Sequence, residues 1–208
     1  MKVLLVNGSP HKNGSTNAVL QHMAEEFARE GVTAEVFWLG NQPIAGCNGC
    51  RVCDTTNECV IDDVVNTFRA KAKEADGFIF ATPVHYAAAS GAITSFMDRL
   101  FYSEPGGETF RYKAAAAVAV ARRGGTTATL DQLNKYFAIS EMYQVGSSYW
   151  NMVHGANGEE VFRDEEGMRT MRVLARNMVY FLRCQEAGRA AGVALPRQEE
   201  PKRTNFIR

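Results

Sequence analysis

The N-terminal segment of this chain passes from a strand pattern to a helical pattern through a polar, glycine-containing loop. Residues 3–6 form a continuous apolar run, Val-Leu-Leu-Val, which is typical of a strand buried on both faces. Val19, Leu20, Met23 and Phe27 then recur at the spacing of one helix face. Strands buried on both faces occur chiefly in parallel sheets covered by helices. The segment therefore predicts the first β-α unit of an α/β protein.

The loop between these patterns, residues 7–17, has the composition of a phosphate-binding turn. A helix N-terminus offers free backbone N–H groups and the positive end of its dipole, and the hydroxyls of Ser9, Ser15 and Thr16 add donors. Gly14 is followed by Ser-Thr and not by the Lys-Ser or Lys-Thr of a nucleotide triphosphate loop, and G-x-G-x-x-G spacing is absent. A terminal monophosphate fits better. The alternative is an ordinary polar turn in which Ser15 caps the helix.

Four further apolar runs alternate with helical patterns. Strands are predicted over residues 32–39, 78–81, 114–121 and 141–145, and helices begin near residues 64, 90, 126 and 167. The alanine-rich third run in this list fits a helix equally well, but a strand there preserves the alternation. Pro83 is expected to end its strand, because it cannot donate to the ladder. Five strands separated by helices predict an α/β fold with a doubly wound parallel sheet, strand order 2-1-3-4-5, and helices on both faces.

Length and composition indicate one cytoplasmic domain. Residues 1–190 accommodate the pattern as a single domain with a Cys-rich loop at 46–60, and residues 191–208 form a C-terminal tail. The 23 basic and 23 acidic residues balance, which argues against nucleic acid or an anionic membrane as a partner. The N-terminus has no signal-peptide pattern and no run long enough to span a membrane, so a cytoplasmic location is expected.

Four of the five cysteines are crowded together, at Cys47, Cys50, Cys53 and Cys59. In a reducing cytoplasm such crowding indicates a metal or redox site. Compact runs of C-x-x-C steps hold 4Fe–4S clusters, because a short loop can curl so that each thiolate meets one corner of the cube. Structural zinc is the main alternative, although zinc loops usually pair two C-x-x-C elements at longer separation. A third reading is that the cysteines hold no metal.

Several motifs together resemble one family. Gly-Ser-Pro after the first strand with the Ser-Thr that follows, Thr-Pro at residues 82–83 with Ser-Gly at 90–91, and Asp-Arg-Leu at 98–100 are similar to motifs of the NAD(P)H-dependent FMN reductases and iron–sulfur flavoproteins. These families belong to the flavodoxin-like superfamily. The cysteine spacing resembles the compact motif of the iron–sulfur flavoproteins, and the resemblance extends from residue 2 to about residue 183. It implies FMN and a 4Fe–4S cluster as cofactors, with NAD(P)H as a candidate donor.

In such sheets a ligand binds beyond the carboxyl ends of the strands, where three loops are expected to meet. The expected FMN contacts are Ser9, His11, Lys12, Asn13, Ser15, Thr16 and Asn17 in the first loop, Pro83, Val84, His85 and Tyr86 in the second, Arg122, Arg123, Gly124 and Gly125 in the third, and Trp150 at the open face of the ring. Asp98-Arg99 is expected to be a structural pair. No protein acid or base is assigned, because the flavin carries the chemistry.

The leading hypothesis is an FMN-dependent oxidoreductase of the iron–sulfur flavoprotein type. A cluster-free NAD(P)H-dependent FMN, quinone or azo reductase is the nearest alternative, and a non-enzymatic flavodoxin-like electron carrier is the third. The redox partner would be a nicotinamide, a quinone or a ferredoxin, and the resemblance implies a homodimer or homotetramer. Because the cysteine loop leaves the second strand at the edge where the flavin loops meet, the cluster is expected on the cofactor side of the molecule. The loop could also reach outward and place the cluster against the flavin of a neighbouring subunit instead of its own.

Overall fold

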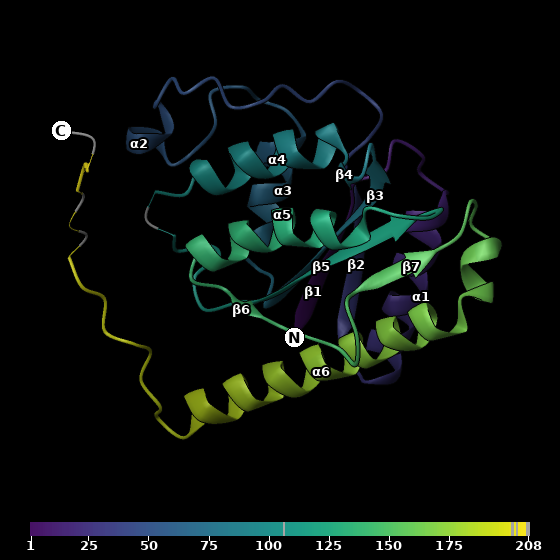
Figure 1. Cartoon of the computed structure of the whole chain (residues 1–208). Helices are drawn as coiled ribbons and strands as arrows, with labels where there is room; N and C mark the ends of the chain where they lie inside the picture. Colours follow the sequence, from purple (N-terminus) through teal and green to yellow (C-terminus); the bar gives the residue numbers. More distant parts are fainter. Residues whose placement is uncertain (106, 201, 203, 207–208) are drawn as a thin grey trace.

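The computed structural model describes residues 1–105, 107–200, 202 and 204–206, so residues 201, 203, 207 and 208 of the predicted tail lie outside the described residues. Its centre is a parallel sheet in the order β2-β1-β3-β5-β6 (Figure 1). These strands are β1 (Lys2–Asn7), β2 (Thr33–Trp38), β3 (Gly77–His85), β5 (Ala114–Ala121) and β6 (Tyr143–Gln144). The predicted α/β class with a five-stranded parallel core is thus confirmed.

The order is numbered 2-1-3-5-6 and not 2-1-3-4-5, because the unforeseen strand β4 shifts the numbers of the last two core strands, whose positions are as predicted. A second short strand, β7, was also not foreseen. β4 (Ala88–Ala89) pairs antiparallel with the end of β3, and β7 (Met152–His154) pairs parallel with β5, along the edge that also carries β6. The strand expected over residues 141–145 is only two residues long in β6. Pairings of two or three residues contain too little periodicity to be recognised in a sequence.

The prediction that Pro83 ends its strand is wrong. β3 continues through Pro83, which is in register with Val120, whereas the pairing of β3 with β1 ends at Ala81. Ala81 O accepts a hydrogen bond from Gly8 N at 2.9 Å on the β1 side. Because backbone groups alternate along a strand, the nitrogen of Pro83 faces that same edge, past the end of β1. Its missing N–H therefore removes no ladder bond.

Helices cover both faces of the sheet (Figure 1). The first face is packed by α1 (Ser15–Arg29) and α6 (Glu165–Ala190), and the second by α3 (Val64–Ala72), α4 (Gly91–Tyr102) and α5 (Thr126–Ile139). In β1, Val3 and Leu5 belong to the core on the first face, and Leu4 and Val6 to the core on the second. This explains why residues 3–6 are continuously apolar. Two short helices complete the chain, α2 (Cys53–Thr56) and the 3-10 helix η1 (Glu160–Arg163). Among the described residues, no helix has the length and apolar character needed to cross a membrane.

A buried carboxylate joins α1 to α6. The Glu26 side chain is 2% exposed and accepts hydrogen bonds from Arg29 Nη1 at 2.7 Å and from Arg176 Nε at 2.5 Å. Burial alone would raise the pKa of this carboxyl, but the hydrogen bonds from the two guanidinium groups outweigh burial. The pKa of Glu26 is therefore lowered from its ordinary value of 4.5.

We expect Glu26→Gln to lower the free energy of unfolding by about 1–3 kcal/mol at pH 7, because two charge-assisted hydrogen bonds lose their anion. A lowered folded pKa means that this contribution is complete above the unfolded value near 4.5 and is lost as pH falls through the folded pKa. Urea denaturation at pH 7 and at pH values below 4.5 measures it. Glu25→Gln, at an exposed neighbour, is the control. A deficit in Glu26→Gln that stayed constant down to the lowest pH would contradict this account.

Candidate functional site

The loop after β1 is curled by short hydrogen bonds. Asn7 Oδ1 accepts from Ser9 N at 3.0 Å, and Ser9 Oγ accepts from His11 N at 3.1 Å. Trp38, at the end of β2, donates Nε1–H to Ser9 O at 2.8 Å, and Lys12 Nζ lies 5.8 Å from the centre of the Trp38 ring. The loop is therefore preshaped by its own backbone and by the neighbouring strand.

The start of α1 faces this loop with free donors. Gly14, not Ser15, is the N-cap, and it makes no side-chain cap hydrogen bond, so the alternative in which Ser15 caps the helix is wrong. The first helical hydrogen bond runs from Ala18 N to Gly14 O at 3.0 Å. The N–H groups of Ser15, Thr16 and Asn17 precede it and belong to the open end of the helix. This end of α1 can bind an anion.

These donors open onto a cleft of about 850 Å³ at the carboxyl ends of β1, β3 and β5. Of the predicted FMN contacts, the cleft is lined by Ser9, His11, Lys12, Asn13, Ser15, Thr16, Pro83, Val84, His85 and Arg122. It is also lined by Trp38, Asn41 and residues 155–158, which the sequence analysis missed. Residues 155–158 read Gly-Ala-Asn-Gly and follow β7. Recognising β7 as a strand would have marked this turn as a fourth loop at the same edge.

The second loop is a tight hairpin tied to the first loop. Ser90 Oγ donates to Gly8 O at 3.2 Å, and Ser90 N donates to Thr82 Oγ1 at 3.3 Å. The hairpin turn contains two left-handed residues, one of them Ala87 with φ 61°. Gly125, with φ 100°, packs directly against it, since a Cβ at Gly125 would lie 2.5 Å from Ala87 Cα. The glycine is required by this close approach.

Several predicted contacts lie outside the cleft lining, namely Asn17, Tyr86, Arg123, Gly124, Gly125 and Trp150. Tyr86 stands fully exposed at the hairpin tip. Trp150 packs edge-on against Tyr149, with ring centroids 4.5 Å apart, and lines a separate hollow of about 250 Å³ beside α5 and β6. The chain returns to the cleft only after β7. The placement of Trp150 over the flavin ring is therefore not supported by this geometry.

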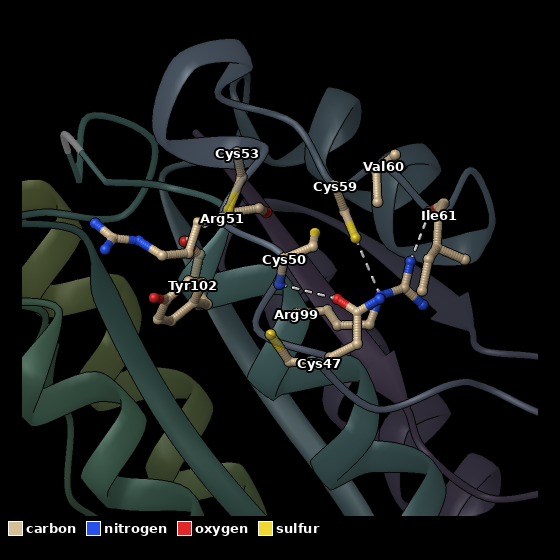
Figure 2. Close-up of a pocket in the computed structure, with 11 residues that line it drawn as sticks. Cys47, Cys50, Arg51, Cys53, Cys59, Val60, Ile61, Arg99 and Tyr102 are labelled. Atoms are coloured by element: carbon tan, nitrogen blue, oxygen red, sulfur yellow. Dashed lines mark hydrogen bonds between the residues drawn. The ribbon is translucent and has the colours of Figure 1, made fainter.

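All four clustered cysteines line one narrow cavity (Figure 2). Cys53, at the start of α2, is buried, and its Sγ donates to Tyr102 O at 3.7 Å. Cys47 and Cys50 are exposed, and Cys59 is partly buried. The cavity volume of about 20 Å³ is roughly that of one water, so a larger group requires the loop to widen. Burial, reinforced by the negative charge of Asp54, raises the pKa of the Cys53 thiol.

No three Cys, His, Asp or Glu side chains among the described residues converge closely enough to hold one metal ion. Zinc requires such convergence, because its thiolate ligands all lie about 2.3 Å from one centre. In a 4Fe–4S cluster each thiolate binds a different iron, so the ligands stand further apart around the core. The structure thus brings the four thiols to one cavity without arranging them as a metal-binding group among the described residues.

Asp98 and Arg99 do not form the structural pair that was expected. Asp98 accepts a hydrogen bond from Tyr136 OH at 2.5 Å, and burial together with this bond raises the pKa of Tyr136. Arg99 has a fully buried side chain that pairs with Asp63 at 2.6 Å and donates Nε–H to Cys59 Sγ at 3.2 Å. Burial alone would lower the pKa of Arg99, but these two partners raise it, so the guanidinium stays charged.

The cysteine cavity and the cleft lie at opposite ends of α4. Ser90, the N-cap of α4, contacts Gly8 in the loop after β1, whereas Tyr102, its last residue, contacts Cys53. The 12 residues of α4 span about 18 Å at 1.5 Å per residue. The chain after β2 runs along this helix to reach α2 (Figure 1). The expectation that the cysteine loop lies on the cofactor side of its own chain is therefore wrong.

The chain is similar to a known family of proteins. The model of a family described as NADPH-dependent FMN reductase matches residues 1–157. An iron–sulfur flavoprotein from Methanocaldococcus jannaschii is 32% identical over 187 residues, which cover 86% of this chain and 95% of that protein.

The chain is also similar to an azoreductase and to a solved flavodoxin. An NADPH azoreductase from a Bacillus species is 32% identical over 139 residues, covering 66% of this chain and 67% of that protein. Among solved structures, a flavodoxin from the domain Archaea has a TM-score of 0.58 at 13% identity and covers 88% of this chain and 99% of that chain. At this identity the likeness concerns the fold alone, which is flavodoxin-like.

Proposed function

This chain belongs to the NADPH-dependent FMN reductase family, and from that membership and its site we propose that it is an FMN-dependent oxidoreductase of the iron–sulfur flavoprotein type. Membership makes it a flavin oxidoreductase enzyme, which removes the non-enzymatic carrier from the alternatives. The observation that carries the iron–sulfur assignment is the gathering of Cys47, Cys50, Cys53 and Cys59 around one cavity. We also propose that residues 1–190 form one FMN-binding domain.

The start of α1 would bind the FMN phosphate. Backbone N–H groups of Ser15 and Thr16 and the hydroxyls of both residues face the anion from the helix end, where the dipole adds a favourable field. Ser9 Oγ already accepts a hydrogen bond from His11 N, so its own proton is free to be donated to the phosphate. A site built mainly from backbone donors suits a terminal phosphate.

The flavin ring would occupy the cleft between the hairpin and the loops after β5 and β7. Pro83 and Val84 provide apolar lining, and Arg122 provides a cation. The hairpin is held in place by Ser90, so this lining is rigid before the ligand arrives. Bound FMN supplies the hydride and electron chemistry, and the protein contributes geometry and electrostatics. NAD(P)H is the proposed donor, as in the family.

The cysteines would hold a 4Fe–4S cluster, which accepts one electron at a time. Because the cysteine cavity and the cleft are separated by the length of α4, we propose that the protein is a homodimer or homotetramer in which the cysteines of one chain approach the cleft of another. The acceptor would be a quinone, a ferredoxin or a related redox partner. A reducing cytoplasm suits four unpaired thiols.

The second candidate is a cluster-free azo, quinone or FMN reductase. It is favoured by the similarity to the Bacillus NADPH azoreductase and by the narrowness of the cysteine cavity. In that case the cysteines are free thiols of an exposed loop, and nicotinamide and acceptor bind in turn at the same cleft.

Anaerobic purification followed by metal, sulfide and flavin analysis separates the two candidates. The proposal expects bound FMN together with about four iron atoms and four sulfides per chain. Zinc, or no metal, in anaerobically prepared protein would establish the cluster-free reductase instead. Rapid mixing with NADH, NADPH and reduced ferredoxin then identifies the donor. If all three left the flavin oxidised, the reductase role itself would fail.

A further inference from the structure

We propose that Arg99 is a positioning residue for the cysteine site: its buried guanidinium closes both ends of the cysteine loop and donates a hydrogen bond to the sulfur of Cys59. The effect on redox potential rests on the proposed function, because it needs a bound cluster. The closure of the loop by Arg99 does not need a cluster.

Arg99 is the centre of a dense set of contacts. Its side chain is 1% exposed, and its nitrogen atoms donate to Asp63, to Ile61 O at 2.6 Å, to Ala45 O at 3.4 Å and to Cys59 Sγ at 3.2 Å. Ala45 precedes the cysteine loop, whereas Ile61 follows it. One side chain on α4 therefore holds both ends of the loop, as Figure 2 shows for the Cys59 end.

Arg99 has an N–H donor that its ion pair with Asp63 does not use. Asp63 accepts from both terminal nitrogens, at 2.6 and 3.0 Å, which is a bidentate pair that leaves Nε–H free. That remaining donor points at Cys59 Sγ and at no oxygen. A planar guanidinium with a fixed fork can make these contacts together, whereas a lysine ammonium cannot reproduce them.

A cationic donor on a ligand sulfur has a specific electrostatic consequence. Hydrogen bonds to cluster sulfurs and nearby positive charge favour the more electron-rich state, and they are recognised determinants of cluster potential. Arg99 should therefore raise the reduction potential of a cluster bound through Cys59. It also holds the Cys59 sulfur at the cavity, where that sulfur would serve as a ligand.

Asn66 offers a matched comparison, because it also binds Cys59, but through the backbone and not through the sulfur. Its Nδ2–H donates to Cys59 O at 2.9 Å. Asn66→Ala removes a contact to Cys59 on the backbone only, and alanine keeps α3 helical. If the role of Arg99 were purely structural, variants at both positions would loosen the loop and leave the midpoint potential of the cluster unchanged.

The test uses Arg99→Met, Arg99→Lys and Asn66→Ala in the full chain. In iron-free protein, amide exchange over residues 45–61 should be at least about tenfold faster in Arg99→Met, with the rest of the chain unchanged. In anaerobically loaded protein, the cluster content of Arg99→Met should fall and its midpoint potential should become more negative, with a smaller shift in Arg99→Lys. Asn66→Ala should loosen the loop and leave the potential unchanged.

The outcomes separate this proposal from the proposed function. Wild-type protein that binds no cluster overturns the function, while loop exchange still tests the closure by Arg99. A loaded Arg99→Met with the wild-type potential, or with a shift no larger than that of Asn66→Ala, overturns the positioning role. If Arg99→Met does not fold, Arg99→Lys decides the same question through its potential.

Discussion

Replacing Ser15 and Thr16 together by alanine should weaken FMN binding by a factor of roughly 10² to 10⁴. Each hydroxyl that donates to a charged phosphate contributes about 1.5–3 kcal/mol, and both residues line the cleft at the open end of α1. The backbone donors remain, so binding is weakened and not abolished. Alanine suits the first turn of a helix, and the iron- and flavin-free protein should keep nearly its wild-type stability. Isothermal titration of the apoprotein with FMN measures the loss.

Thr126 and Thr127 provide a matched control, because they occupy the first two positions of α5 as Ser15 and Thr16 do in α1. Neither threonine lines the cleft. Their double alanine variant should bind FMN with an affinity within about threefold of the wild type. Equal FMN affinities in the two double variants would remove the start of α1 from the phosphate site.

Most of the fold could be predicted because long elements leave strong periodic signals. The strand over residues 114–121 matches β5 at both ends, although its alanines fit a helix equally well, since the alternation of the chain decided between the two. β4 and β7 are two and three residues long and contain no such signal. Missing β7 had a consequence for the site, because the turn at residues 155–158 enters the cleft only through it.

The helix start after β1 was predictable for a local reason, whereas the other parts of the cleft and the cysteine cavity depend on long-range packing. Ser15 and Thr16 lie at a helix start that the sequence itself marks. Trp38 reaches Ser9 across 29 positions of sequence, and Arg99 reaches Cys59 across 40, and no local pattern announces either contact. Trp150 illustrates the reverse case, because an exposed aromatic in a loop suggested stacking, but its side chain lines a separate hollow.

Replacing Cys50 by alanine should abolish cluster binding while FMN remains bound. Cys50 is exposed, so its side chain adds little to the core, and the variant should fold with nearly wild-type stability. A cluster with only three thiolates has an iron without its protein ligand and is readily lost. The cleft lies at the other end of α4, so the phosphate and ring contacts are unaffected. Iron, sulfide and flavin content, measured after anaerobic purification, are the readouts.

Cys184→Ala is the control, because Cys184 is also an exposed free thiol but lies on α6, outside the cysteine cavity. It should retain iron, sulfide and FMN. Reduction of the flavin by NAD(P)H should survive in both variants, whereas transfer to one-electron acceptors should be lost only in Cys50→Ala. If Cys50→Ala kept the wild-type iron content, the cysteines around the cavity could not be acting as a set of four ligands. If both variants were iron-free and fully active, electrons would pass from the flavin to the acceptor at the cleft itself, as in the cluster-free reductase.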